Sequence, residues 1–479
     1  MRVTFLGFTV PDEIARANLT ADPNPQVQTT TFAHAVLGAV TSAGVTMTLL
    51  STMPVSSYPG QPRLLFRSRR FVDGGAEGQL LGFVNVLGVK QLTRLVQCLT
   101  RGTARLRRWR PDVLLVHGVH TPFLAFGLLV QRVLDLPVAV ILTDPPGVAL
   151  PDEGSFRRRL HAFDRRLARA ALIRVRGVVA LTAALASDFA PGVPALVLEG
   201  ICSSVPVPRT TRSDEKAPLL VYAGGLSRSY GVDLLVDAVL ARADGTRLQL
   251  YGRGELSDWL DEVARKEPRV LPVQFVPREE VALGYAAADV LVQPRPVNQD
   301  FVPYSFPSKL IEFLASGVPV LSTRLPGIPA DYEAHLDWIE DDSAAGVNAA
   351  LDALLAVPAD QRRLRAQEAA RFVVTTRSQR HQGERLATFL HNLTLGDDDV
   401  SASPPPDRAG SRLLRLARST RSSRPPDGSA ASGSASPRVS WLELGIQRQL
   451  WTPSPSNHGR HSSHITKNQS SSARKGRLN

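Results

Sequence analysis

Short apolar runs alternate with longer amphipathic stretches through most of this 479-residue chain. In the first part the runs are RVTFLGF, VTMTLLST, DVLLVHG, PVAVILTD, GVVALT and ALVLEG, each bounded by turn residues. Because they are apolar on both faces, they are typical of strands covered on both sides, as in a parallel sheet. Helices are expected between them over 32–43, 89–108, 122–134 and 156–174. Repeated strand–helix units predict a doubly wound α/β domain.

The same pattern begins again after a Pro- and charge-rich stretch, SSVPVPRTTRSDEKAP. LLVYAGG, RLQLYG, VQFV, VLVQP and PVLST are expected to be strands with helices between them, and further helices are expected over 343–355, 360–373 and 377–392. The sequence therefore predicts two tandem Rossmann-like domains that face a cleft. The expected divisions are a first domain over 1–202, a linker over 203–217, a second domain over 218–375, a helix packing back across both over 376–395, and a disordered tail over 396–479.

Composition narrows the class of protein. Two cysteines in so long a chain exclude a disulfide scaffold, and no run reaches the roughly 18 to 20 apolar residues of a membrane span. The start, MRVTFLGF, lacks the pattern of a signal peptide, so a cytoplasmic location is expected. Most of the net charge of +12 lies in the Ser-, Pro- and Arg-rich tail, which has 13 Lys and Arg but only 3 Asp and Glu from residue 401 onward. A nucleic-acid partner for the whole protein is therefore not expected.

The segment FPSKLIEFLASG predicts a short helix that begins near Pro307 and stops at Gly317. Its apolar residues cover most of the circumference and leave a narrow polar stripe with Ser308, Lys309 and Glu312. An anion at the helix start would be bound by the free amides, the Ser308 hydroxyl and the Lys309 ammonium. The alternative is an ordinary helix with a surface Lys–Glu pair.

The turn AGGLSRSYG follows the expected strand LLVY directly. Gly224 and Gly225 allow backbone amides to approach a diphosphate, and Arg228 adds a cation for a bidentate contact. The turn lacks the GxGxxG spacing of nicotinamide-binding proteins. The alternative interpretation is a flexible turn with a solvated arginine.

The run YSFPSKLIEFLASGVPVLSTRLPGIPADY, with YAGGLSRSYGVDLL upstream and LVQPRP between them, resembles retaining glycosyltransferases of the GT-B fold, family 4 type, in a polysaccharide-biosynthesis-like subgroup. The resemblance implies a nucleotide-sugar donor, most often linked to UDP or GDP, and a glycan or lipid-linked acceptor. It also implies retention of the anomeric configuration without a metal or cofactor. The first domain would lie on the acceptor side and the second would hold the nucleotide sugar.

Two family motifs are altered in this chain. In the family's Glu-x7-Glu pattern the second Glu binds the ribose and matches Glu312, but Tyr304 stands at the first position. The family's Arg and Lys on the diphosphate are replaced by Gly225 and Tyr230. Arg228 and Lys309 are the expected replacements for these charges, and together with Asp144 they are the catalytic candidates. The donor-binding candidates are Gly224, Gly225, Ser308, Glu312 and Tyr304.

The first domain offers three further candidates at the ends of expected strands. Asp144 ends AVILTD and is expected to point toward the cleft, with a turn before two prolines as the alternative. His117 and His120 follow VLLV and are acceptor-side candidates, with structural or solvent-facing roles as the alternative.

The stretch SFRRRLHAFDRRLARAALIRVR carries an apolar stripe among arginines, so it is either a peripheral membrane contact or a packed helix with its arginines in water.

Three other functions are alternatives to sugar transfer. They are nucleotide-sugar binding without turnover by a catalytically reduced GT-B protein, a sugar-nucleotide 2-epimerase of similar architecture, and tail-dependent nucleic-acid binding.

Overall fold

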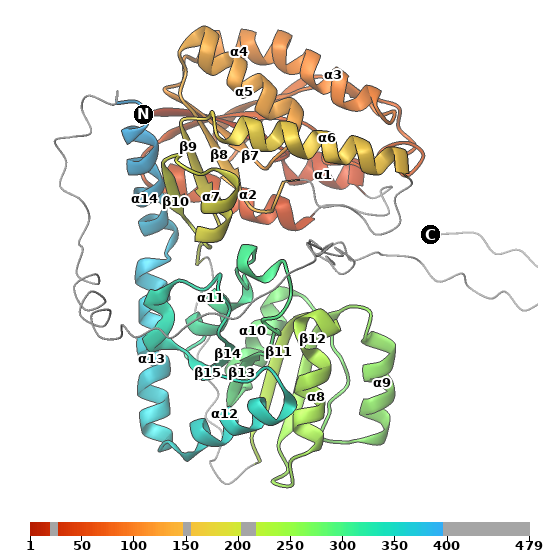
Figure 1. Ribbon diagram of the computed structural model, residues 1–479, viewed down its shortest axis with the longest axis vertical. Helices are drawn as coiled ribbons and strands as arrows, with labels where there is room; N and C mark the ends of the chain where they lie inside the picture. Colours follow the sequence, from red (N-terminus) through yellow and green to blue (C-terminus); the bar gives the residue numbers. More distant parts are fainter. Residues whose placement is uncertain (20–26, 147–154, 203–216, 396–479) are drawn as a thin grey trace, which may run out of the picture.

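The computed structural model describes residues 1–19, 27–146, 155–202 and 217–395. It shows two α/β lobes placed one above the other, with the last helices running along one side of both (Figure 1). The linker and the basic tail predicted from the sequence lie outside the described residues, apart from Ala217. None of the helices in the described ranges is long and apolar enough to cross a bilayer.

The N-terminal domain is built on an eight-stranded sheet in the order β10-β9-β8-β7-β1-β2-β5-β4, parallel except for the pairing of β4 with β5. Its strands are β1 (Arg2–Gly7), β2 (Thr46–Ser51), β4 (Arg69–Asp73), β5 (Ala76–Leu80), β7 (Val113–His117), β8 (Val138–Leu142), β9 (Gly177–Ala180) and β10 (Ala195–Val197), with a small pair β3 (Leu65–Phe66) and β6 (Phe83–Val84) beside it. Its helices are α1 (Asp12–Leu19), α2 (Val27–Ser42), α3 (Val89–Gln97), α4 (Thr103–Trp109), α5 (Thr121–Leu134), α6 (Ser155–Leu172) and α7 (Ala183–Phe189), and a π-helical segment, Cys98–Gly102, joins α3 to α4.

The C-terminal domain has a five-stranded parallel sheet in the order β12-β11-β13-β14-β15. Its strands are β11 (Leu219–Gly225), β12 (Arg247–Arg253), β13 (Val290–Gln293), β14 (Val320–Thr323) and β15 (Asp337–Ile339). Its helices are α8 (Val232–Leu240), α9 (Ser257–Lys266), α10 (Arg278–Ala287), α11 (Lys309–Ala315), α12 (Ala344–Ala356) and α13 (Ala359–Thr376), with single 3₁₀ turns at Arg228–Tyr230, Val302–Tyr304 and Ala330–His335. The last helix, α14 (Gln379–Asn392), packs on α2 of the N-terminal domain.

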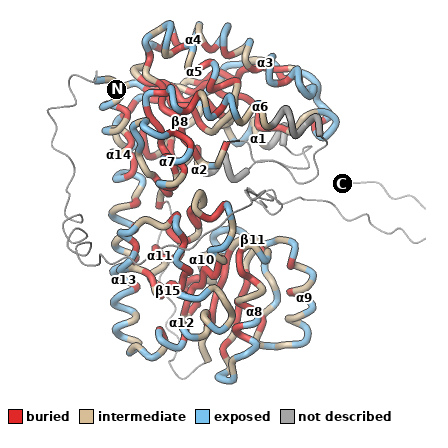
Figure 2. The backbone as a smooth tube through the Cα atoms, viewed as in Figure 1, coloured by how far each residue is buried: buried red, intermediate tan, exposed pale blue. Residues whose placement is uncertain are grey.

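The inner strands of each sheet are buried on both faces, which explains the continuous apolar runs in the sequence. In β7, Leu114 and Val116 belong to one core cluster, whereas Val113 and Leu115 belong to the cluster on the opposite face. Figure 2 shows the buried residues concentrated in the two sheets, with exposed residues mainly on the outer helices and in loops. The prediction of two Rossmann-like α/β domains is confirmed.

Three local predictions differ from the structure. VQFV is not a strand, because this segment makes only an isolated bridge between Gln274 and Tyr251, beside β12. The helix expected over 89–108 is interrupted by the π-helical segment. The strands β4 and β5 and the pair β3–β6 are not predicted by the sequence, since these short or partly exposed strands lack a continuous apolar run.

A buried ionic network joins the two domains on the side of the last helices. Arg377, between α13 and α14, pairs with Glu199 at 2.5 Å and with Asp331 at 2.5 Å. Tyr332 donates a further hydrogen bond to Glu199 at 3.0 Å. The side chains of Glu199 and Arg377 are 2% and 7% exposed. Because Glu199 follows β10 and Tyr332 lies in the C-terminal domain, the network fixes one domain on the other.

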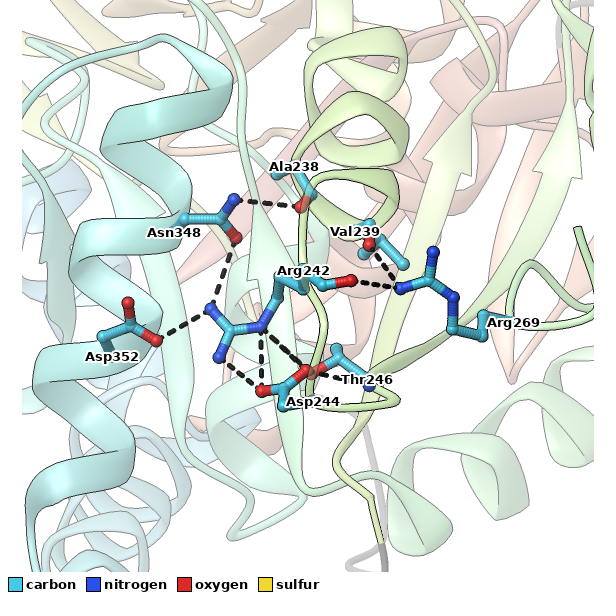
Figure 3. Close-up of polar contacts among 8 residues, drawn as sticks. All are labelled: Ala238, Val239, Arg242, Asp244, Thr246, Arg269, Asn348 and Asp352. Carbon is cyan, nitrogen blue, oxygen red and sulfur yellow. Dashed lines mark hydrogen bonds and ion pairs between the residues drawn. The ribbon is translucent and has the colours of Figure 1, made fainter.

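A second arginine cluster holds the amino-terminal edge of the C-terminal sheet (Figure 3). Arg242, just after α8, pairs with Asp244 at 2.5 Å and with Asp352 of α12 at 2.8 Å. Arg269 donates to carbonyls at the end of α8 and just beyond it, at 3.0 Å to Val239 and 2.7 Å to Arg242. The Arg242 guanidinium holds the pKa of Asp244 well below its ordinary value. This cluster precedes β12 and is structural, because the ligand side of a parallel sheet lies at the strands' carboxyl ends.

Candidate nucleotide-sugar site

The FPSK segment lies where α11 begins, and its polar residues contact one another. Ser308 is exposed at the helix start and its side chain makes no capping hydrogen bond. Glu312 accepts from Lys309 at 2.9 Å and from Arg278 of α10 at 3.0 Å. The Glu312 side chain is 17% exposed. A carboxylate with two cations beside it is held in place and still reaches the surface.

The glycine turn after β11 is in close backbone contact with its neighbours. A side chain at Gly252 would lie 1.9 Å from the Gly224 carbonyl, and one at Gly231, where φ is 71°, would lie 2.0 Å from the Pro294 carbonyl. Only glycine fits at these two positions. The carboxyl ends of β11, β12 and β13 therefore meet in one place, around Gly224 and Gly225.

Arg228, the expected diphosphate ligand in this turn, points outward. Its side chain is 68% exposed and pairs with Asp233 at 3.1 Å, while its backbone amide donates to Glu255 at 3.1 Å. Tyr230, which replaces the family's lysine, is buried. A different arginine, from the segment after β13, lies over the Tyr230 ring.

That cation is Arg295, a residue that sequence reasoning did not single out although it lies within the quoted LVQPRP. It follows β13, is 5% exposed, and lies with its guanidinium 4.6 Å from the centre of the Tyr230 ring. Nη1 donates to the Ser305 hydroxyl at 3.0 Å, and Nε is buried without a hydrogen-bond partner. Among the described residues no carboxylate pairs with Arg295, and burial lowers its pKa. Arg295 is thus a buried cation without a carboxylate partner, in contact with the glycine turn through Tyr230 and with Ser305 just before the FPSK segment.

Tyr304, at the position of the family's first Glu, connects the two domains. Its hydroxyl donates to Asp188 of α7 at 2.8 Å, and its ring lies 5.2 Å from that of Phe189. Because α7 follows β9, the carboxyl edges of both sheets face each other here. The structure thus brings Tyr304 close to the N-terminal domain.

The N-terminal candidates lie at the carboxyl edge of their sheet. Asp144 follows β8, is exposed, and accepts from the Thr143 hydroxyl at 2.8 Å. His117 is 1% exposed and burial lowers its pKa to about 4. His120 lies 2.8 Å from Gln91 through Nε2, and burial together with the charges of Arg94 and Lys90 keeps its pKa well below the ordinary value. Both histidines are therefore neutral near pH 7.

The expected membrane helix is α6, and its apolar residues divide between two faces. Ala168, Ala171 and Leu172 are buried in the core, whereas Phe163 and Leu167 expose 58% and 42% of their surface. The side chains before Ala162 lie outside the described residues. Part of the predicted stripe is thus core and part faces outward.

The two tandem domains, with a last helix that returns to the first, have the GT-B fold. Sucrose-phosphate synthase from Thermosynechococcus elongatus superposes with a TM-score of 0.57 at 14% identity, over 82% of this chain and 99% of that one. The catalytic domain of starch synthase IV from Arabidopsis thaliana, bound to ADP and acarbose, gives 0.54 at 10% identity, over 82% and 99%. Anabaena Alr3699/HepE in complex with UDP gives 0.52 at 14% identity, over 82% and 100%.

Sequence comparison adds a match to the C-terminal domain. Residues 217–356 match the family described as glycosyl transferases group 1. Glycogen synthase from Mycobacterium tuberculosis (strain H37Rv) is 26% identical over 276 residues, which are 54% of this chain and 64% of that protein. The chain thus spans less than two thirds of this curated relative's length. Together with the fold, these matches support a GT-B glycosyltransferase.

Proposed function

We propose that this protein transfers a sugar from a nucleotide-sugar donor to a glycan or lipid-linked acceptor, retaining the anomeric configuration and needing no metal or cofactor. The observation that carries the proposal is the unpaired buried Arg295 between the glycine turn and the FPSK segment. This edge lies within the residues that match the glycosyltransferase family. Two structures of the same fold, starch synthase IV bound to ADP and HepE in complex with UDP, support a donor of this class.

In the proposed donor complex, Glu312 accepts hydrogen bonds from the ribose hydroxyls. Amides of Gly224 and Gly225 and the Ser308 hydroxyl bind the diphosphate. Departure of a nucleoside diphosphate builds negative charge on its β-phosphate, and Arg228, Lys309 and Arg295 stabilise that charge as it forms. The tight packing of the turn against β12 and β13 supports a preorganised site.

The N-terminal domain holds the acceptor in this proposal. Asp144 lies near the acceptor as a catalytic candidate, and neutral His120 and His117 orient it by hydrogen bonds. The leaving phosphate takes the acceptor proton, so no protein nucleophile is required. The outward Phe163 and Leu167 of α6 support a peripheral contact with the inner face of a membrane from the cytoplasm.

A second candidate function is nucleotide-sugar binding without turnover. It is favoured by Tyr304, whose hydroxyl is engaged by Asp188 where the family has a carboxylate. Donor hydrolysis or transfer by the purified protein would exclude it. Conversion of the donor sugar without an acceptor would instead indicate a 2-epimerase.

A thermal-shift screen of nucleoside diphosphate sugars tests the proposal directly. A matching donor at about 100 times its dissociation constant is expected to stabilise the protein by about 2.7 kcal/mol. The corresponding nucleosides, which lack the diphosphate, serve as controls and should give smaller shifts. Equal midpoints with every nucleotide sugar would contradict the proposed function.

Replacing Glu312 with alanine is expected to weaken nucleotide binding about a hundredfold, because two charge-assisted hydrogen bonds to the ribose are lost. The measurement is calorimetric titration with UDP, GDP or ADP, whichever binds. The 2′,3′-dideoxy form of the same nucleotide should bind both proteins equally. Glu262→Ala, which removes an exposed carboxylate paired with Lys266 on α9, is the matched control. A similar loss with the dideoxy nucleotide would assign Glu312 a structural role instead.

A further inference from the structure

Helix α3 packs with its charged residues inward and its apolar residues outward. Lys90 and Arg94 are buried, with 6% and 3% of their surface exposed. Val89, Leu92 and Val96, at helical spacing, expose 43%, 62% and 46%. A surface helix normally buries its apolar stripe and exposes its charges. The arrangement of α3 is therefore the reverse of an ordinary surface helix.

The outward stripe continues beyond the helix. Val86 before α3 and Leu99 after it expose 38% and 37% of their surface and extend the same spacing. The adjoining α4 and its flanks carry the exposed arginines Arg101, Arg107, Arg108 and Arg110. An apolar stripe bordered by cations is the surface that binds an anionic bilayer.

The inward face holds Arg94 without a counterion. Its Nη2 donates to the Met53 carbonyl at 2.7 Å, and Nη1 lies 3.4 Å from Nε2 of His120. Its guanidinium lies over the rings of Phe8 and Phe83, 5.2 and 4.3 Å from their centres. No carboxylate in the described ranges pairs with Arg94, and burial lowers its pKa to about 9. Burying an unpaired cation is costly, so an anion at this position would stabilise it.

In the described part of the chain, several buried hydrogen-bonding groups at this end of the sheet have no partner. They include Nε of Arg94, Nδ1 of His120 and the hydroxyls of Thr9, Ser51, Thr52 and Thr121. Thr9 and Thr52 are neighbours in sequence of Phe8 and Met53, which contact Arg94. All four hydroxyls lie at or just beyond the carboxyl ends of β1, β2 and β7, the ligand side of the sheet. Because buried polar groups are almost always hydrogen-bonded, this set indicates a ligand rich in acceptor oxygens.

We propose that the inner face of α3 binds the phosphate of a lipid-linked acceptor while its outer stripe lies on the bilayer that carries the lipid. The proposal rests on the proposed function and names its acceptor as a lipid phosphate. A phosphate has three or four oxygens to accept from Arg94 and from hydroxyls at this end of the sheet, which suits this set of donors better than a planar carboxylate. One helix thus presents a cation to the headgroup and an apolar stripe to the chains.

The inner face is tested by calorimetric titration of the full chain with dihexanoyl phosphatidic acid, a water-soluble lipid phosphate, in the presence of excess UDP. Arg94→Gln is expected to weaken binding at least tenfold, and Thr52→Val, which is nearly isosteric, about threefold. Arg105→Gln is the matched control, because Arg105 also lies on a helix of the N-terminal domain, but its guanidinium donates to Gln79. Unchanged binding by folded Thr52→Val and Arg94→Gln would overturn the proposal.

The outer face is tested by sedimentation with phosphatidylcholine vesicles that contain phosphatidic acid. Leu92→Gln is expected to weaken vesicle binding about tenfold. Leu283→Gln, at a residue of the C-terminal domain with 59% exposure, should leave it unchanged. If glucose 1-phosphate binds as tightly as the lipid phosphate, the lipid assignment is wrong.

The two proposals fail separately. Nucleotide binding without Arg94-dependent phosphate binding would overturn only the lipid-phosphate site. Arg94-dependent binding with no affinity for any nucleoside diphosphate would overturn the proposed function.

Discussion

Replacing Arg295 with methionine is expected to lower turnover of the nucleotide-sugar donor by about 10²- to 10³-fold, the usual effect of removing one preorganised group that stabilises charge in a transition state. Arg228 pairs with Asp233 and Lys309 pairs with Glu312, whereas Arg295 has no carboxylate partner in the described part of the chain. Its charge is therefore the least compensated at this edge. Methionine keeps the flexible, unbranched apolar part of the side chain while removing the guanidinium and its charge.

The test separates this role from a structural one. Binding of the nucleoside diphosphate should fall about tenfold or more in Arg295→Met, while binding of the corresponding nucleoside should not change. Arg324→Met is the control, since Arg324 is an exposed arginine of the same domain that pairs with Glu333. A parallel loss of nucleoside affinity would show that Arg295 acts only through the fold.

Replacing Arg377 with methionine is expected to lower the free energy of unfolding by about 3–5 kcal/mol. The substitution leaves Glu199 buried, with Tyr332 as its remaining hydrogen-bond donor in the network. The size of the effect follows from burial, because a carboxylate with 2% side-chain exposure cannot be solvated when its cation is removed. Urea denaturation of both proteins measures the change.

Arg380→Met provides the comparison for this prediction. Arg380 is 83% exposed and forms an i,i+4 pair with Glu384, so its loss should cost about 0.5 kcal/mol or less. Glu199→Gln combined with Arg377→Met should recover part of the stability, since no charge is then left buried. Equal effects of the two single arginine substitutions would contradict the network's role at the domain junction.

Much of the fold was predictable from hydrophobic patterning. Strands such as β7 and β8 are buried on both faces, so their sequences are continuously apolar and easy to recognise. VQFV shows the limit of that signal, because a short apolar run also occurs in an irregular segment that only bridges to β12. The partly exposed β4 and the two-residue β3 and β6 carry no pattern that a single sequence makes visible.

The candidate site was predictable where a motif names its residues. FPSK and the glycine turn indicated Ser308, Lys309, Glu312, Gly224 and Gly225, and the structure places them at the carboxyl edge of the C-terminal sheet. The direction of a side chain was not predictable: Arg228 lies in the expected turn but is directed outward to Asp233.

The sequence by itself determined two α/β domains and the positions of the glycine turn and the FPSK segment, because strand burial and helix starts depend on neighbouring residues. Only the tertiary structure decided which cations are buried without a counterion. Arg295 and Arg94 look like ordinary surface arginines in the sequence, and the periodicity of α3 predicts an apolar stripe turned toward the core. Their burial depends on contacts with other segments of the chain. Arg295 contacts Tyr230 and Ser305, and Arg94 contacts Phe8, Met53 and His120. A local sequence pattern does not predict such contacts.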